Sequence, residues 1–203
     1  LPVREDELHV RRHHVAQVAE ARERGEEAEV LAGSLRGHAL RGEAAVVRKG
    51  EALTVPGVSL AAGEATLEAS GGVGRGQALR WQLRVPALHA LWPEGHGSIT
   101  AEGEMAGELA RPTLKGELAI AALQVPGLAL EAASADWDLD LAGRREQRLR
   151  LSLQGLATAG RSLSADLHVA GPLSGLVLES HTQLAADETL ALQLTGTLTL
   201  DPP

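Results

Sequence analysis

The sequence predicts an all-β protein in which one long, curved antiparallel sheet forms an open apolar trough. Many stretches alternate apolar and polar residues, as in 97–109 and 189–200, and a period of two is that of a strand with one dry and one wet face. Glycine and proline separate these stretches and mark turns. The 203 residues include no Phe, no Tyr and three Trp, which favours a thin aliphatic layer, because aromatic side chains normally anchor a thick core.

The N-terminal 50 residues allow two interpretations. Their Ala, Glu and Arg content favours a helix by propensity. However, the apolar spacing of Val15 and Val18 covers barely two turns, and Gly25 interrupts it. A hairpin that pairs 8–20 with 26–37 also fits, and we favour it because the chain downstream is strand.

From residue 38 onward the alternating stretches follow one another closely. We expect strands at 38–48, 52–60, 64–70, 77–85, 97–109, 113–122, 128–141, 148–154, 161–170, 176–184 and 189–200. Leu88, Leu91 and Trp92 are at helical spacing and predict one helical turn that covers a sheet edge. The leucines of 128–141 change parity, which predicts a β-bulge or kink near 132–135.

A phrase repeats within the chain. Residues 107–116 and 171–180 both read Gly-x-Leu, then a short breaker, then x-Leu. Each phrase closes one strand and opens the next by a tight hairpin. The sequence therefore predicts a repeating meander, and the only Met, at position 105, suggests one segment of a longer array.

Composition excludes several classes of function. The net charge is −8 and no basic stripe with interleaved aromatics occurs, so we expect no nucleic-acid binding. Cysteine is absent, which rules out disulfides and thiolate chemistry. No uncharged apolar stretch reaches the roughly 18 residues that a membrane-spanning helix needs.

The candidate chemical motifs favour structural roles. The glycine-rich 71–76 leads into a strand, whereas a phosphate cradle would open a helix. Asp136, Asp138 and Asp140 alternate with apolar residues and lack the glycine and glutamate of a calcium loop. The eight histidines show no zinc spacing, and Glu102 with Glu104 resembles a solvated strand face. We expect no catalytic, cofactor or metal site, and no enzyme.

The dry face is poor in bulk. Small residues occupy inward positions of several strands, namely Ala101, Gly103, Gly107, Ala165 and Gly196. A sandwich or a filled barrel would need larger side chains there to reach normal packing density. This pattern favours an open groove.

A family resemblance follows from the central stretch. Leu88-x-x-Leu91-Trp92-Pro93-x-x-x-Gly97, then Gly103, then Gly107-x-Leu109-x-x-Pro112-x-Leu114-x-Gly116, resembles the TamB family of Gram-negative bacteria. The resemblance extends through 123–141 and 163–171. Residues 61–203 match the family better than residues 1–60, which resemble it only in their general residue pattern. We expect 1–203 to be a single segment of a TamB-like groove domain.

The resemblance implies a periplasmic segment of a large protein that is anchored in the inner membrane by an N-terminal helix. The family's sheet curls into a trough called a β-taco, akin to AsmA-like and chorein-type bridge proteins. These proteins are linked to phospholipid transport between membranes. TamB is also linked to the assembly of autotransporters and other nascent outer-membrane proteins, with an Omp85-type, TamA-like partner.

Our leading hypothesis is a lipid conduit in which a dry groove shields phospholipid acyl chains. The expected lining residues are Ile99, Met105, Leu109, Leu139, Leu151, Leu167, Leu192 and Leu194. A chaperone-like scaffold for outer-membrane β-barrel strands is the second hypothesis. A closed, adhesin-like β-solenoid is the third.

Overall fold

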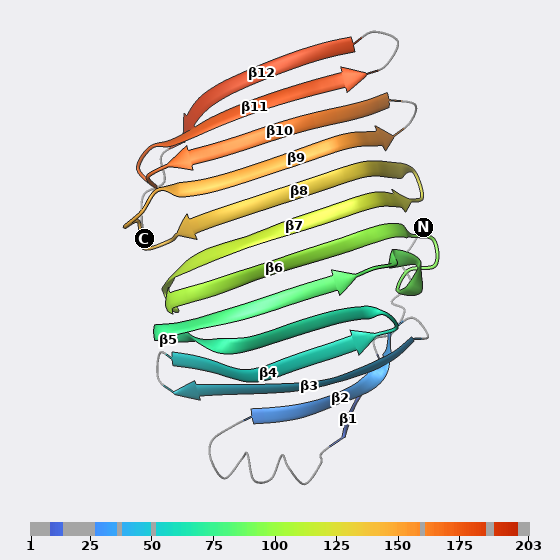
Figure 1. Ribbon diagram of the computed structural model, residues 1–203, viewed down its shortest axis with the longest axis vertical. Coiled ribbons are helices and arrows are strands. Elements are labelled where there is room, and N and C mark those ends of the chain that lie inside the picture. Colours follow the sequence, from blue (N-terminus) through green and yellow to red (C-terminus); the bar gives the residue numbers. More distant parts are fainter. Residues whose placement is uncertain are drawn as a thin grey trace.

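The computed structural model describes residues 9–13, 27–35, 38–49, 52–158, 161–185 and 189–198. All strands of this part form one 12-stranded sheet in chain order, and each pairs antiparallel with its sequence neighbours (Figure 1). The predicted all-β class and the repeating meander are confirmed. Within the described residues the sheet is neither closed into a barrel nor covered by a second sheet, as expected for a trough of the β-taco type.

The strands are long and the connections between them are short. The elements are β1 (His9–His13), β2 (Glu27–Leu35), β3 (His38–Lys49), β4 (Ala52–Ala62), β5 (Ala65–Val85), the 3-10 turn η1 (Leu88–Ala90), β6 (His96–Glu108), β7 (Arg111–Val125), β8 (Leu128–Asp140), β9 (Gln147–Thr158), β10 (Arg161–Gly171), β11 (Leu176–Ala185) and β12 (Thr189–Leu198). The single helical turn expected at Leu88 is present, and it contacts β6.

The N-terminal hairpin is confirmed where the structure describes it. β1 pairs antiparallel with β2, so that His9 lies opposite Ser34 and His13 lies opposite Val30. Residues 14–26, on which the helical alternative rested, lie outside the described residues, as does His14.

The glycine-rich segment 71–76 is a reversal of the chain inside β5. Residues 65–73 pair with β4 and residues 78–85 pair with β6, so β5 consists of two arms that lie side by side (Figure 1). Gly71 (φ 113°) approaches the second arm so closely that a Cβ there would overlap the Ala78 carbonyl oxygen. The predicted turn is confirmed, because only glycine fits this conformation at this distance.

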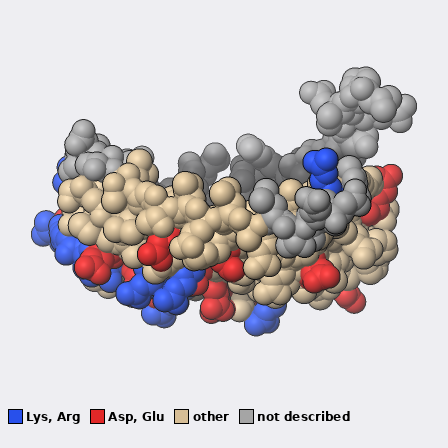
Figure 2. Space-filling view, turned by 90° about the horizontal axis from the view of Figure 1, so that it is seen from above, with Lys and Arg blue, Asp and Glu red and all other residues tan. Residues whose placement is uncertain are grey.

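Register gives the two faces opposite characters. On one face of the central strands, Leu83, Ala101, Leu118 and Ala135 follow one another across the sheet. The intervening residues of the same strands are mostly charged or polar. Figure 2 shows most of the visible charged side chains along the lower outline of the molecule, with uncharged residues above them.

The layer is thin. Few of the described apolar side chains are buried, and most of those are small or β-branched: Val47, Val55, Ala62, Ala65, Val73, Val85, Ala101, Leu130, Ala133 and Leu176. The other described leucines of the strands are half-buried or exposed. This distribution agrees with the aliphatic layer that the scarcity of aromatic residues predicts.

One irregularity crosses four strands, and we call it the seam: Gly97 (β6), Ala122 (β7), Glu131 (β8) and Gly155 (β9). The β6–β7 register shifts at Gly97 and the β9–β10 register shifts opposite Gly155. Gly97, Ala122 and Gly155 have positive φ angles of 109°, 50° and 62°.

The seam corrects the predicted bulge at 132–135. Residues 132–135 pair regularly with both neighbouring strands, so that position was wrong. The change of parity is real but lies at Glu131, which is exposed between the buried Leu130 and the buried Ala133. Because the side-chain alternation shifts by one residue at the seam, the leucines before and after it lie on the same face of the strand.

Candidate functional site

The apolar face consists of parallel rows that run across the strands. The row nearest the β6–β7 turn is Leu79, Met105, Leu114 and Leu139. The third row continues from Leu83 through Leu151 and Leu167 to Leu194. Because cross-strand neighbours have Cβ atoms about 5 Å apart, each row presents a nearly continuous aliphatic surface.

The second row contains two tryptophans separated by two glycines. Trp81 lies opposite Gly103, Gly103 opposite Gly116, and Gly116 opposite Trp137. A Cβ at Gly103 would come within 2.8 Å of the Trp81 indole, and one at Gly116 within 2.5 Å of the Trp137 indole. The indoles therefore lie over the glycines. Side chains from β5 and β8 fill the space that the glycines of β6 and β7 leave empty.

Seven of the eight expected lining residues share this face. Ile99, Met105, Leu139, Leu151 and Leu167 are half-buried within it. Leu192 and Leu194 lie on β12 and are 62% and 57% exposed. Within the part of the chain that the structure describes, no second layer covers them.

The eighth expected lining residue, Leu109, is not part of a strand. β6 ends at Glu108, and Leu109 lies in the β6–β7 turn, where it is 40% exposed. The alternation counted in the sequence continued past the end of the strand. Conversely, Trp81 and Trp137 belong to the face and were not among the expected lining residues, although both alternate with polar neighbours.

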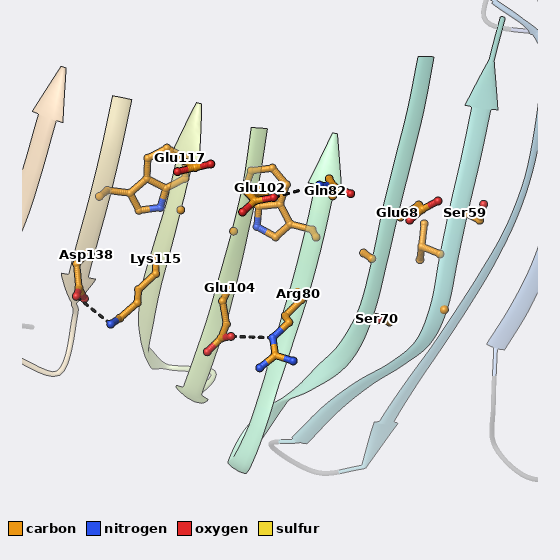
Figure 3. A pocket seen from close by; sticks show the side chains of 17 residues that line it. Ser59, Glu68, Ser70, Arg80, Gln82, Glu102, Glu104, Lys115, Glu117 and Asp138 are labelled. Atoms are coloured by element: carbon orange, nitrogen blue, oxygen red, sulfur yellow. Dashed lines mark hydrogen bonds and ion pairs between the residues drawn. The ribbon is translucent and has the colours of Figure 1, made fainter. Parts of the chain in front are cut away.

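The opposite face carries paired charges. Arg80 Nε donates to Glu104 at 2.9 Å, and Lys115 Nζ lies 3.0 Å from an Asp138 oxygen. Gln82 Nε2 donates to Glu102 at 3.1 Å. These groups line a hollow of about 920 Å³ that extends from β4 to β8 (Figure 3). Glu102 and Glu104 thus have solvated partners, as expected for a wet strand face.

Asp140 has a structural role. It is 2% exposed, and its carboxylate accepts the backbone N–H groups of Ala142 and Arg144 at 3.0 and 3.1 Å. The side chain of the buried Gln147 accepts a hydrogen bond from the Asp140 backbone N–H and donates one to the Asp140 carbonyl oxygen. This network closes the β8–β9 turn. Among the described residues, no cluster of His, Asp and Glu has the geometry of a metal site.

Among the described residues, one pair of histidine rings lies close together. The rings of His89 and His96, on either side of the turn after η1, have centroids 6.1 Å apart. No helix in the described residues has the length and apolarity needed to cross a bilayer. The prominent feature of the molecule is therefore the uncovered apolar face, which is an open surface and not a closed pocket.

The comparisons agree with this architecture. The family model described as "TamB, N-terminal domain" matches residues 27–200. Neither the search of curated proteins nor the search of solved structures gave a match. The TamB family is membrane-associated, works with partner proteins in outer-membrane assembly, and acts in transport and assembly instead of catalysis. Because this family model matches most of the sequence, the chain belongs to the TamB family.

Proposed function

We propose that this chain is a segment of a lipid conduit, in which the apolar face shields phospholipid acyl chains during transport between the inner and outer membranes. The observation that carries the proposal is the uncovered face itself. Leu192 and Leu194 are more than half exposed, and the central leucines are only half-buried. Contiguous exposed apolar surface on this scale is typical of a binding surface.

The energetics favour lipid as the occupant. Exposing one CH₂ group to water costs about 0.8 kcal/mol, so two bare acyl chains face a barrier on the order of 20 kcal/mol. The 12 strands of the sheet, spaced about 4.8 Å apart, give roughly 55–60 Å of face. A long surface of moderate affinity lowers the barrier at every point without holding the lipid tightly.

Native mass spectrometry of the purified chain tests the proposal. We expect phospholipid to co-purify in non-covalent complexes and to be lost on extraction with organic solvent. Protein that is lipid-free and that does not take up phospholipid from vesicles would argue against the conduit. The placement in the periplasm, below an inner-membrane anchor and facing an Omp85-type TamA-like partner, is part of the same proposal.

A second function rests on the same apolar face. A chaperone-like scaffold for nascent outer-membrane proteins would hold the apolar side chains of their β-strands against the uncovered rows of half-buried and exposed leucines.

A photocrosslinking amino acid at Leu151 distinguishes the two functions. Leu151 lies on β9 in the apolar face, three strands from β12. Lipid adducts in cells would support the conduit, whereas polypeptide adducts would support the scaffold. The same group at Gln154, which is exposed on the same strand, is the control.

A further inference from the structure

The charges of the sheet are segregated along the strand direction. Figure 2 shows most of the Lys and Arg atoms at one end of the lower face, on the left, which is the side of the β5 reversal and of the β6–β7 and β8–β9 turns in Figure 1. We call this side the basic lip: the chain reversal at 71–76 and the turns at 109–111 and 141–146. The basic lip stands out in a chain whose net charge is −8.

Each of these three reversals contains arginine, whereas the β10–β11 turn at 172–175, on the same side, has no charged residue. The four arginines are Arg75, Arg111, Arg144 and Arg145. On the described part of the opposite lip, Glu64 and Glu94 lie in the connections and Arg161 begins β10. The two lips of the same apolar face thus differ in their electrostatic character.

The basic lip also holds Glu146, and Glu108 lies opposite Arg111, so its four arginines still outnumber these two carboxylates. Asp138 pairs with Lys115 and with Arg145 at 3.0 and 3.7 Å, and Glu104 pairs with Arg80. Asp140 accepts two backbone N–H groups of its own turn. Among the described residues, Arg75 and Arg144 make no side-chain ion pair, and both are exposed. They can therefore attract an anion from solution.

The apolar rows begin directly inside the basic lip. The first row includes Met105 and Leu114, and the second includes Trp81 and Trp137. From Met105 to Ile99 is six residues, or roughly 20 Å of strand at about 3.3 Å per residue. One leaflet of a bilayer offers acyl chains about half of its roughly 30 Å hydrocarbon core. A chain that starts at the basic lip therefore fits within the strand length.

Building on the proposed function, we propose that phospholipids lie along the strands with their phosphate at the basic lip and their acyl chains pointing toward the opposite lip. The occupant is a glycerophospholipid whose phosphate carries negative charge. Its phosphate interacts with Arg75 and Arg144, while its chains cover the rows from Met105 to Ile99. The lipid thus has one orientation on the face, and the headgroups follow one side of the trough.

Tryptophan fluorescence tests the orientation, because the chain has three Trp and no Tyr. Trp81 and Trp137 lie near the basic lip, and Trp92 follows η1 at the opposite lip. In the W92F variant the remaining fluorescence comes from Trp81 and Trp137, near the basic lip. In the W81F/W137F double variant it comes from Trp92, at the opposite lip. The probes are vesicles of phosphatidylglycerol brominated either next to the ester or near the end of one acyl chain.

We expect ester-proximal bromine to quench W92F severalfold more strongly than chain-terminal bromine, and the order to be reversed in W81F/W137F. Equal or opposite orders would overturn the orientation while leaving the conduit intact. Absence of quenching in both variants would overturn the orientation and the conduit together.

Neutralising the lip provides an independent readout. R75Q/R144Q should bind phosphatidylglycerol about tenfold more weakly and bind diacylglycerol, which lacks the phosphate, as before. R161Q, on the opposite lip, is the matched control and should change neither affinity. An unchanged phosphatidylglycerol affinity in R75Q/R144Q, or equal losses for both lipids, would overturn the assignment of the basic lip.

Discussion

The indole of Trp137 lies over Gly116 of the neighbouring strand, so closely that a Cβ at this glycine would come within 2.5 Å of the ring. Trp81 covers Gly103 in the same way at 2.8 Å. A tryptophan and a glycine on adjacent strands therefore fill one volume, so a larger residue at the glycine would collide with the ring.

We predict that Gly116→Ala lowers the free energy of unfolding by about 1–3 kcal/mol, because the added methyl group would lie within 2.5 Å of both the Trp137 indole and the Glu102 carbonyl oxygen. Gly196→Ala is the matched control. It lies on the same row, and a Cβ there would meet nothing within 4 Å. Urea unfolding followed by circular dichroism measures both. A loss in the control as large as that in Gly116→Ala would contradict the interpretation.

Leu192→Asp combined with Leu194→Asp should abolish lipid binding while the chain stays folded. Both side chains are more than half exposed on β12, so the charges remain solvated, but they interrupt two apolar rows. Uptake of fluorescent phospholipid from vesicles measures the effect.

Gln193→Asp combined with Thr195→Asp places the same charges on the other face of β12 and should bind lipid normally. Normal uptake by the Leu192/Leu194 variant would count against the apolar face as the binding surface.

Alternation of apolar and polar residues predicted much of the fold because each strand has one apolar and one polar face. β6 and β12 begin and end within a residue or two of the predicted bounds, and the turn at 71–76 follows from glycine chemistry. Residues 14–26 lie outside the described part, so the two interpretations of that stretch stay untested.

What alternation could not predict is the relation between strands. That Trp81 would meet Gly103 depends on register, which pairs residues 22 positions apart and leaves no local signal. The bulge was predicted at the wrong residues for a related reason. Ala122 in the seam has a positive φ, which is unusual for alanine, and nothing in the sequence of β7 marks this position. The strand predicted at 97–109 ends one residue earlier, at Glu108, because a count of alternation does not show where a strand ends.

Gln147→Ala should destabilise the chain by about 2–4 kcal/mol. The buried amide accepts the Asp140 N–H at 2.6 Å and donates to the carbonyl oxygens of Asp140 and Arg145 at 3.0 and 2.9 Å. Removing it leaves buried groups without partners, each of which costs roughly 1–3 kcal/mol.

The control for this change is Gln154→Ala. Gln154 lies on the same strand but is exposed, so its loss should change the urea midpoint little. Equal midpoints for the two variants would show that the turn network contributes nothing measurable.

Ala122→Gly should stabilise the chain, although glycine in a strand normally destabilises it. Ala122 has a φ of 50°, which costs an alanine about 1–2 kcal/mol, and glycine removes that strain at a cost of roughly 0.5–1 kcal/mol in chain entropy. We expect a net gain of about 0.5–1 kcal/mol in urea unfolding. Ala121→Gly, next to it and without a positive φ, should lose stability instead. If both substitutions destabilise equally, the backbone at the seam is not strained, and the change of parity must arise from side-chain packing around Leu130 and Ala133.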